Sequence, residues 1–506
     1  MFKNIAANII GKFWSVLSNY LFIPVYISLL GIENYAVISF SFILIGVMSV
    51  MDAGLTATLS REFAKHDEES SSNRKLRMLN TFEACYWCIA VIAIVIIFVF
   101  AGSIAKEWIS LKSLSVGEVT IALQIFGAGM AFQLLGNFYI GGLIGLEHQL
   151  KANLYQIIWG VFRNGLVLLV ILVKPSLILF FSWQAIITLL YVLFLRYALT
   201  NTLKKKAGIS LHSFVFDKSL LIASRKFVGG MLLISFVAAI NTQLDKIAIS
   251  KLLPITELGY YNLGISLTQV LLVLVAPISI ALLPRFTLLY STSKNDEAGK
   301  LFNVVQLIVA ILIFSIAGNI MVYSRELLFV WTGDAKLALL SSKYVLYLAI
   351  GTGMLALQVI PFNIAIANGY TKINNVLGIS SLFISVPGYW LSVLYFGPTG
   401  AAITWCIIQS LTTPIYLYYI KKKFLKKQGY LEMLATQILK PAVAALATAF
   451  LLSLLLPQIS NRILQLLLIG FSTFVTLIFA TFISIPLNDL NSYWLMARNK
   501  VIHRRI

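Results

Sequence analysis

The sequence predicts an all-α polytopic membrane protein of about fourteen transmembrane helices, arranged as two parallel six-helix lobes followed by two further helices. Three observations lead to this prediction. The 506 residues are 59% hydrophobic and 11% charged, with a mean hydropathy of +0.89. Apolar runs long enough to cross a bilayer recur along the whole chain. The two halves of the chain also share short sequence patterns.

Each predicted helix is an apolar run of spanning length, because a hydrocarbon core of about 30 Å needs about 20 residues of α-helix. Six runs come before the longest polar gap, at residues 9–30, 35–56, 79–105, 118–142, 153–173 and 176–197. Six more follow it, at residues 227–250, 258–284, 301–323, 339–367, 376–396 and 400–420. The last two, residues 434–456 and 463–485, come after a lysine cluster.

Basic residues predict the orientation of these helices. If the helices alternate in direction, most lysines and arginines fall on one side of the membrane: Lys3, 61–77, Lys151, 196–226, 285–300, Lys372, 421–427 and 498–505. Cytoplasmic loops carry the excess of positive charge, so both termini are expected in the cytoplasm. The net charge of +20 is therefore a topology signal, with attraction to anionic lipid. Nucleic-acid binding is not expected, since no soluble domain carries the charge.

The polar segment 201–224 divides the chain into four predicted parts. These are an N-terminal lobe (1–200), this cytoplasmic linker, a C-terminal lobe (225–423) and two additional helices with a basic cytoplasmic tail (424–506). YISLLGIENYAVIS from Tyr26 is echoed by ISKLLPITELGYYNLGIS from Ile249, and GGLIGLEHQLKAN from Gly141 by NIAIANGYTKINN from Asn363. Because six is an even number, both lobes begin on the same side and form parallel repeats about an axis along the membrane normal.

Several of these stretches also carry a family resemblance. The chain resembles the lipid-linked oligosaccharide (polysaccharide) flippases of the multidrug/oligosaccharidyl-lipid/polysaccharide exporter superfamily, and among them the O-antigen or capsule repeat-unit transporters. The stretches are LLGIENYAVIS from Leu29, MDAGLTATLSREFAKH from Met51, IGGLIGLEHQLKAN from Ile140, NTQLDKIAISKLLPITELGYY from Asn241, ELLFVWTGDA from Glu326, ANGYTKINN from Ala367 and FGPTGAAITW from Phe396. Two features depart from the pattern: Pro254 stands where many relatives have glycine, and the first helix lacks the arginine cluster of peptidoglycan-precursor flippases.

The resemblance implies a V-shaped pair of lobes around a central cavity in the bacterial cytoplasmic membrane. The implied substrate is undecaprenyl pyrophosphate carrying an oligosaccharide repeat unit of O-antigen, capsule or exopolysaccharide. It would move from the cytoplasmic to the outer leaflet by alternating access, without a cofactor. The implied partners are this lipid-linked glycan and membrane lipid, and the resemblance also allows for polysaccharide polymerase and chain-length proteins.

A polar stripe on the fifth predicted helix is the first candidate site. Asn153, Gln156, Gly160 and Arg163 recur at three- and four-residue spacing, so they share one helix face. Ionisable residues inside a membrane usually face protein or water. An arginine matches the oxygens of a pyrophosphate because its charged fork donates several hydrogen bonds. The alternative is an arginine that pairs with a carboxylate and locks helices together.

Two further candidates concern gating or ion coupling. Asn241 and Asp245 share a face of the seventh predicted helix, and Asp245 could bind substrate, a coupling proton or a cation. The alternative is that Asp245 pairs with a cationic neighbour. Lys246 is rotated from Asp245 by about 100°, so the two are not expected to face each other. Near the cytoplasmic end of the first two helices, Lys12 and Asp52 either pair across the helices or form a mouth that receives the headgroup.

Weaker candidates for hydrogen bonds to sugars are Gln133 and Asn137 on the fourth predicted helix and Asn363 on the tenth. No catalytic, metal-binding or GxxxxGK phosphate-binding pattern is found, so an enzyme is not expected. A multidrug or organic-ion exporter of the same superfamily is the main alternative function, but it favours an anionic cavity, and Arg163 argues against one. A membrane enzyme of polysaccharide assembly would need catalytic residues near the lipid surface, and none stand out.

Overall fold

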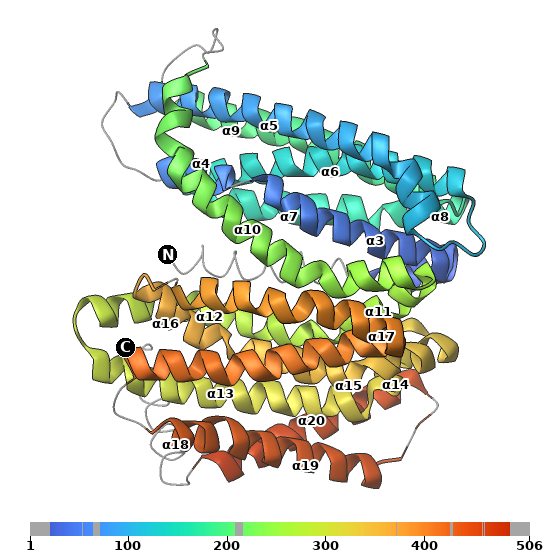
Figure 1. Ribbon diagram of the computed structural model, residues 1–506, viewed down its shortest axis with the longest axis vertical. Coiled ribbons are helices and arrows are strands. Elements are labelled where there is room, and N and C mark those ends of the chain that lie inside the picture. Colours follow the sequence, from blue (N-terminus) through green and yellow to red (C-terminus); the bar gives the residue numbers. More distant parts are fainter. Residues whose placement is uncertain are drawn as a thin grey trace, which may run out of the picture. The chain divides into compact units, whose positions relative to one another are not determined.

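A computed structural model describes residues 21–52, 54–63, 71–207, 216–370, 372–425, 429–457, 459 and 461–485 (Figure 1). These residues form helices and no strand, and an isolated parallel bridge pairs Ser110 with Pro254. Eleven of the described helices are long and apolar enough to cross a membrane. The predicted class, an all-α multi-pass membrane protein, is confirmed.

Contacts between Cα atoms divide the chain into two compact units, Met1–Tyr260 with Ser385–Pro398, and Tyr261–Ile384 with Thr399–Ile506. We call these the first and the second unit. The first contains α2 (Ile23–Leu30), α3 (Ile32–Met48), η1 (Ser49–Asp52), α4 (Leu55–Phe63), α5 (Ser71–Ser103), η2 (Ile104–Trp108), α6 (Val116–Gly145), α7 (Gln149–Gly160), η3 (Val161–Gly165), α8 (Val167–Val173), α9 (Leu177–Ala207) and α10 (Lys218–Leu252).

Helix α11 (Ile255–Thr268) begins in the first unit and ends in the second. The second unit continues with α12 (Val270–Ser291), α13 (Asn295–Val322), α14 (Ser324–Thr332), α15 (Ala335–Leu357), α16 (Val359–Ala367), α17 (Lys372–Phe424), α18 (Tyr430–Leu434), η4 (Ala435–Leu439), α19 (Lys440–Leu455) and α20 (Arg462–Ser484). Residues 385–398 of α17 belong to the first unit.

Most predicted spans coincide with these helices. The predicted runs 376–396 and 400–420 both lie in α17, where the backbone leaves helical geometry at Gly397 (φ 60°, ψ −151°). Glycine adopts such a conformation without steric cost, which explains the turn between the two runs. The run 9–30 lies mostly outside the described residues, and α10, which contains the run 227–250, is not among the eleven helices. The count of fourteen therefore stays a prediction.

Helix α10 also bears on the division of the chain. It packs on α3, η1, α4 and α5, and so belongs to the first unit, although the predicted C-terminal lobe begins at residue 225. The units are defined by contacts and the predicted lobes by sequence repeats. The predicted lobe boundaries therefore stay a prediction.

Helix α6 is the centre of the first unit, where it packs against α9, α5 and α4. Small residues bring these helices close together. A Cβ placed on Gly129 would lie 3.2 Å from the Cα atom of Ala185 in α9, and one on Gly145 would lie 2.5 Å from the carbonyl oxygen of Ser60 in α4. The second position leaves no space for a side chain, so Gly145 is required for the contact between α6 and α4.

A buried polar network joins α5, α6 and α9. The Glu83 side chain is 6% exposed, and its Oε1 atom lies 2.5 Å from Nε of Arg196. The Tyr139 hydroxyl donates to the same oxygen at 2.7 Å. A buried carboxylate without such partners would cost several kcal/mol, so these contacts offset the cost of burying Glu83 inside the helical bundle.

A second carboxylate fixes a loop of the first unit. Glu33, at the start of α3, accepts hydrogen bonds from the backbone N–H groups of Lys112 (2.6 Å) and Ser113 (2.9 Å) and from the Ser113 hydroxyl. On the other side of this loop, Ile255 N donates to Ser110 O at 3.2 Å. The loop before α6 is therefore held both by the start of α3 and by the turn between α10 and α11.

Helix α13 has the corresponding role in the second unit, where it packs against α15, α19 and α20. Asn319 of α13 is buried and makes two bonds to α20, accepting from the Ser472 hydroxyl at 2.7 Å and contacting Oγ1 of Thr476 at 3.2 Å. The last two helices are therefore an integral part of the second unit.

Candidate functional site

The candidate site centres on Arg163, which lies in the π-helical turn η3 between α7 and α8. In this turn Leu166 N donates to the carbonyl oxygen of Val161, five residues back. The widened turn leaves carbonyl groups for side chains to bind. Phe162 O accepts from Nε1 of Trp183 at 2.9 Å, and Asn164 O accepts from the Tyr26 hydroxyl. Single π-helical turns inside α-helices often occur at functional sites.

The guanidinium group of Arg163 lies over an aromatic ring and not beside a carboxylate. Its Cζ atom is 5.1 Å from the ring centroid of Trp159, one helical turn earlier. The Nε atom is buried and has no hydrogen-bond partner within the described chain. Among the described residues no acidic side chain lies within ion-pair distance of Arg163. The alternative that a carboxylate locks this arginine in place thus finds no support in the described residues.

Two more buried donors belong to the aromatic pair formed by Trp159, which lies beside Arg163, and Tyr191. Trp159 stacks on Tyr191 of α9 with 5.1 Å between ring centroids and 12° between ring planes. The Nε1 atom of Trp159 and the hydroxyl group of Tyr191 are buried, and neither has a hydrogen-bond partner in the part of the chain that is described. An unsatisfied buried polar group costs about 1–3 kcal/mol, so a hydrogen-bond acceptor would stabilise each of these donors.

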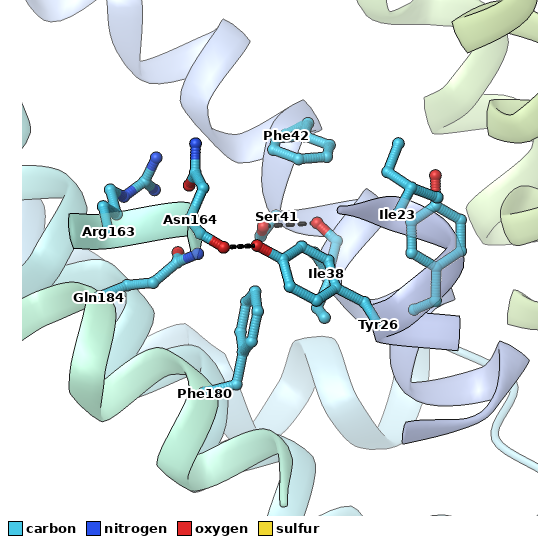
Figure 2. A pocket seen from close by; sticks show the side chains of 10 residues that line it. Ile23, Tyr26, Ile38, Ser41, Phe42, Arg163, Asn164, Phe180 and Gln184 are labelled. Carbon is cyan, nitrogen blue, oxygen red and sulfur yellow. Dashed lines mark hydrogen bonds between the residues drawn. The ribbon is translucent and has the colours of Figure 1, made fainter. Parts of the chain in front are cut away.

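A small cavity lies beside Arg163 within the first unit (Figure 2). Its volume is about 20 Å³, enough for about one water molecule. In Figure 2, Arg163, Asn164 and Gln184 lie on one side of the cavity and Tyr26 on the other. The cavity is too small for a sugar or a pyrophosphate.

The other polar residues predicted on this helix lie on α7. Asn153 is buried, and Gln156 is half-buried. Gln133 on α6 is half-buried, whereas Asn137 is exposed. All four belong to the first unit together with Arg163. Their role in binding the substrate, including sugar binding by Gln133 and Asn137, stays a prediction.

Asn241 and Asp245 lie on α10, in the same unit. The side-chain amide of Asn241 donates to the carbonyl oxygen of Val237 at 3.1 Å, within its own helix. Asp245 is buried, and its Oδ1 atom lies 3.5 Å from Nζ of Lys246. The expectation that Asp245 and Lys246 do not face each other is wrong, because the long lysine side chain folds back along the helix and donates to Thr242 O at 2.7 Å.

The remaining predicted residues have local partners or cannot be placed. Asp52 accepts a hydrogen bond from Oγ1 of Thr56 at 2.5 Å, while Lys12 lies outside the described residues, so their pairing stays a prediction. Asn363 belongs to the second unit and is buried. Its side chain exchanges two hydrogen bonds with Ser279, at 2.9 and 3.0 Å. These bonds hold α16 against α12.

Some residues of interest were not among the sequence candidates. The Glu83–Arg196 pair had a usable signal, because Glu83 is an ionisable residue inside the predicted span 79–105. No sequence signal pointed to Trp159 and Tyr191, since aromatic residues in an apolar run most often pack in a core. Among the described residues, no group of three histidine, cysteine or acidic side chains is arranged to hold a metal ion.

Comparisons with known proteins agree with this architecture. The family model described as "Polysaccharide biosynthesis protein" matches residues 1–289. A putative O-antigen transporter of Shigella flexneri is 22% identical over 387 residues, which cover 75% of this chain and 87% of that protein. The lipid II flippase MurJ in an inward closed conformation has a similar structure, with a TM-score of 0.71, 14% identity and coverage of 95% and 98% of the two chains. An inward-facing multidrug resistance transporter of the MATE family follows, with a TM-score of 0.61, 14% identity and coverage of 81% and 94%.

Proposed function

This chain belongs to the polysaccharide biosynthesis protein family, and we propose that it is a flippase for undecaprenyl-pyrophosphate-linked oligosaccharides. It moves O-antigen, capsule or exopolysaccharide repeat units from the cytoplasmic to the outer leaflet of the bacterial cytoplasmic membrane. The similarity to a putative O-antigen transporter supports a polysaccharide repeat unit as cargo. The fold shared with a lipid II flippase suits a substrate anchored in lipid.

The observation that carries this proposal is the environment of Arg163. A charged residue in the middle of a membrane helix costs roughly 2.5–3.5 kcal/mol on insertion scales. Arg163 has no carboxylate partner among the described residues, and its Nε atom is a buried donor without an acceptor. A pyrophosphate supplies both the negative charge and the acceptor oxygens that this site lacks. The Trp159 ring lies beside Arg163 and stacks on Tyr191, and Trp159 Nε1 and the Tyr191 hydroxyl are two further buried donors without a partner among the described residues.

The proposed transport cycle begins with an opening of the small cavity beside Arg163. Opening on the cytoplasmic side admits the headgroup, whose phosphate oxygens bind Arg163, while Asn153, Gln156, Gln133 and Asn137 bind sugar hydroxyls. Rocking of the two lobes then exposes the headgroup to the outside, where a polysaccharide polymerase can receive it. The polyprenyl chain stays in apolar surroundings throughout.

Acidic side chains are proposed for coupling and gating. Asp245 is buried on α10 and binds the coupling proton or cation, exchanging it for its contact with Lys246. Asp52, with Lys12, gates the cytoplasmic mouth. Substrate contacts by Asn241 and Asn363 require the local hydrogen bonds of these side chains to open during the cycle.

An exporter of organic cations would require a different site. Such a substrate is held by carboxylates and aromatic rings, but the cavity beside Arg163 has no acidic side chain among its described lining residues. The cation already present at the site would repel a second one. The multidrug alternative is therefore disfavoured by the same observation that supports the flippase.

Deletion of the gene tests this proposal in cells. We expect surface polysaccharide to be lost while completed lipid-linked repeat units accumulate on the inner leaflet, as measured by lectin access in spheroplasts and in inverted vesicles. Expression of the protein in the deletion strain should restore the polysaccharide. If repeat units are never completed in the deletion strain, the protein acts in synthesis. If they still reach the outer leaflet, it is not the flippase.

A further inference from the structure

An apolar groove runs between α7 and α9 in the first unit, on the outer side of the Trp159–Tyr191 stack. Its volume is about 380 Å³. Its lining is apolar and aromatic and includes Ile158, Trp159, Phe162, Leu190, Tyr191 and Phe194. Four of these side chains are half exposed at the protein surface, from 46% for Phe162 and Phe194 to 56% for Leu190. Inside a membrane such a surface faces lipid, so the groove is open to a hydrocarbon chain.

The groove shares residues with the Arg163 site. Trp159 lines the groove, stacks on Tyr191, which also lines it, and has the Arg163 guanidinium 5.1 Å from its ring centroid. Phe162 lines the groove and belongs to the π-helical turn that carries Arg163. A molecule with an anionic head and an apolar chain would therefore meet a cation and an apolar channel within one helical turn.

We propose that this groove binds the polyprenyl chain of the lipid-linked substrate, at the isoprene units that follow the pyrophosphate. The proposal rests on the proposed function and extends it from the headgroup to the lipid. It assigns to Trp159 a position between the two parts of the ligand, with the phosphate on the Arg163 side and the chain on the groove side.

The depth of Arg163 argues for this occupant over an ordinary phospholipid. Arg163 is the fifteenth residue of the 25-residue span Gln149–Val173, about 21 Å from its start and about 15 Å from its end. The phosphate of a resting phospholipid lies at the membrane surface, so an acyl chain in the groove would leave Arg163 without an anion. A lipid-linked glycan in transit carries its pyrophosphate across the middle of the membrane and so reaches both the arginine and the groove.

Photo-crosslinking tests the occupant directly. The purified full-length protein in nanodiscs is exposed to polyprenyl pyrophosphate with a diazirine in the isoprene units nearest the phosphate, and labelled peptides are mapped by mass spectrometry. We expect labels on the groove walls, in peptides covering Ile158 and Leu190, and expect excess unlabelled polyprenyl pyrophosphate to compete them away. The same diazirine on a phosphatidylglycerol acyl chain should label these peptides at least tenfold less.

Two substitutions fill the groove from opposite walls, Ile158→Trp on α7 and Leu190→Trp on α9. Each should lower the labelling about tenfold, whereas Leu169→Trp, an exposed position on α8 outside the lining, should leave it unchanged. The use of two walls keeps the test informative if one variant fails to fold, which gel filtration would reveal.

Three results would overturn the groove proposal: labels on other helices, equal labelling by the phospholipid probe, or labelling that survives both tryptophan variants. The transport assay is separate. Wild-type protein that fails to move lipid-linked glycan in proteoliposomes would contradict the proposed function, whatever the groove binds. Transport by the wild-type protein without labelling of the groove would be compatible with the proposed function and would contradict the proposal that the groove binds the polyprenyl chain.

Discussion

Replacement of Arg163 by alanine should weaken substrate binding without unfolding the protein. The guanidinium offers a buried Nε donor without an acceptor in the described residues, and a hydrogen bond to a charged group contributes about 1.5–3 kcal/mol. At 1.4 kcal/mol per factor of ten, Arg163→Ala should raise the KM for lipid-linked glycan about tenfold to 150-fold. Arg163→Lys keeps the charge but loses the planar fork, so its KM should lie between those of Arg163→Ala and the wild type.

Membrane abundance should change little in these variants. Arg163 is not paired with a described carboxylate, so its removal strands no negative charge. Arg163→Ala does remove the cation–π interaction with Trp159, which contributes about 0.5–2 kcal/mol. The desolvation cost of the buried guanidinium also disappears in this variant, and its removal offsets part of that destabilisation.

Arg196→Ala is the matched control, because it removes an arginine that does have a buried partner. The Glu83 side chain is 6% exposed and would lose its ion-pair partner, whereas the Arg196 side chain is 54% exposed. Breaking a fully buried pair costs about 3–5 kcal/mol; the exposure of Arg196 reduces our expectation to about 1–3 kcal/mol. Abundance should therefore fall in Arg196→Ala, while the protein that remains keeps its KM.

The assay measures flipping of a fluorescent lipid-linked glycan in proteoliposomes over a range of substrate concentrations, together with the amount of folded protein. We expect opposite patterns for the two arginines: a raised KM at normal abundance for Arg163→Ala, and a normal KM at lowered abundance for Arg196→Ala. Arg163→Ala with a normal KM at normal abundance would remove Arg163 from the mechanism. A fall in abundance with an unchanged KM would show a structural role like that of Arg196.

Three further predictions concern topology and packing. In a variant without the three native cysteines, a cysteine at Thr399 should react with an impermeant maleimide added outside intact cells and one at Ser293 should not; the reverse result would invert the orientation. Gly145→Ala forces a methyl group against the α4 backbone, about 2.5 Å from a carbonyl oxygen, and should lower membrane abundance severalfold, whereas Gly102→Ala meets no atom within 4 Å and should not. Asn319→Ala removes the bonds from α13 to α20 and should lower the free energy of unfolding by about 1–3 kcal/mol; an unchanged thermal midpoint would contradict this role.

The fold class followed from hydropathy because the length of an apolar run and the thickness of a bilayer are directly related. The turn at Gly397 was visible in the same way, since FGPTG separates two runs of spanning length. The helix at residues 227–250 illustrates the limit. Its apolar residues predict a helix, but only contacts reveal that α10 packs against α3 and α5.

The site was predictable in its charge but not in its surroundings. An arginine inside an apolar run stands out in a sequence, and spacing places Asn153 and Gln156 on its face. The contact with Trp159 and the stack on Tyr191 depend on the packing of α7 against α9, which no local pattern encodes. The prediction that Lys246 and Asp245 do not face each other was wrong because lysine side chains are flexible. A rotation of about 100° per residue describes the directions of Cβ atoms, and the lysine side chain can bend back across that angle.

The π-helical turn at Val161–Gly165 has a consequence for how this helix can evolve. Such a turn holds one residue more than the α-helical turn it replaces, so deletion of one residue there would restore regular winding and leave the helix unbroken. Because the wider ring of the π turn absorbs the extra residue, the deletion would leave the directions of α7 and α8 nearly unchanged. The two carbonyl groups now bound by Trp183 and Tyr26 would return to the helix ladder. The extra residue can thus be gained or lost while both ends of the helix keep their neighbours, and what changes is whether two backbone carbonyl groups are free to bind side chains.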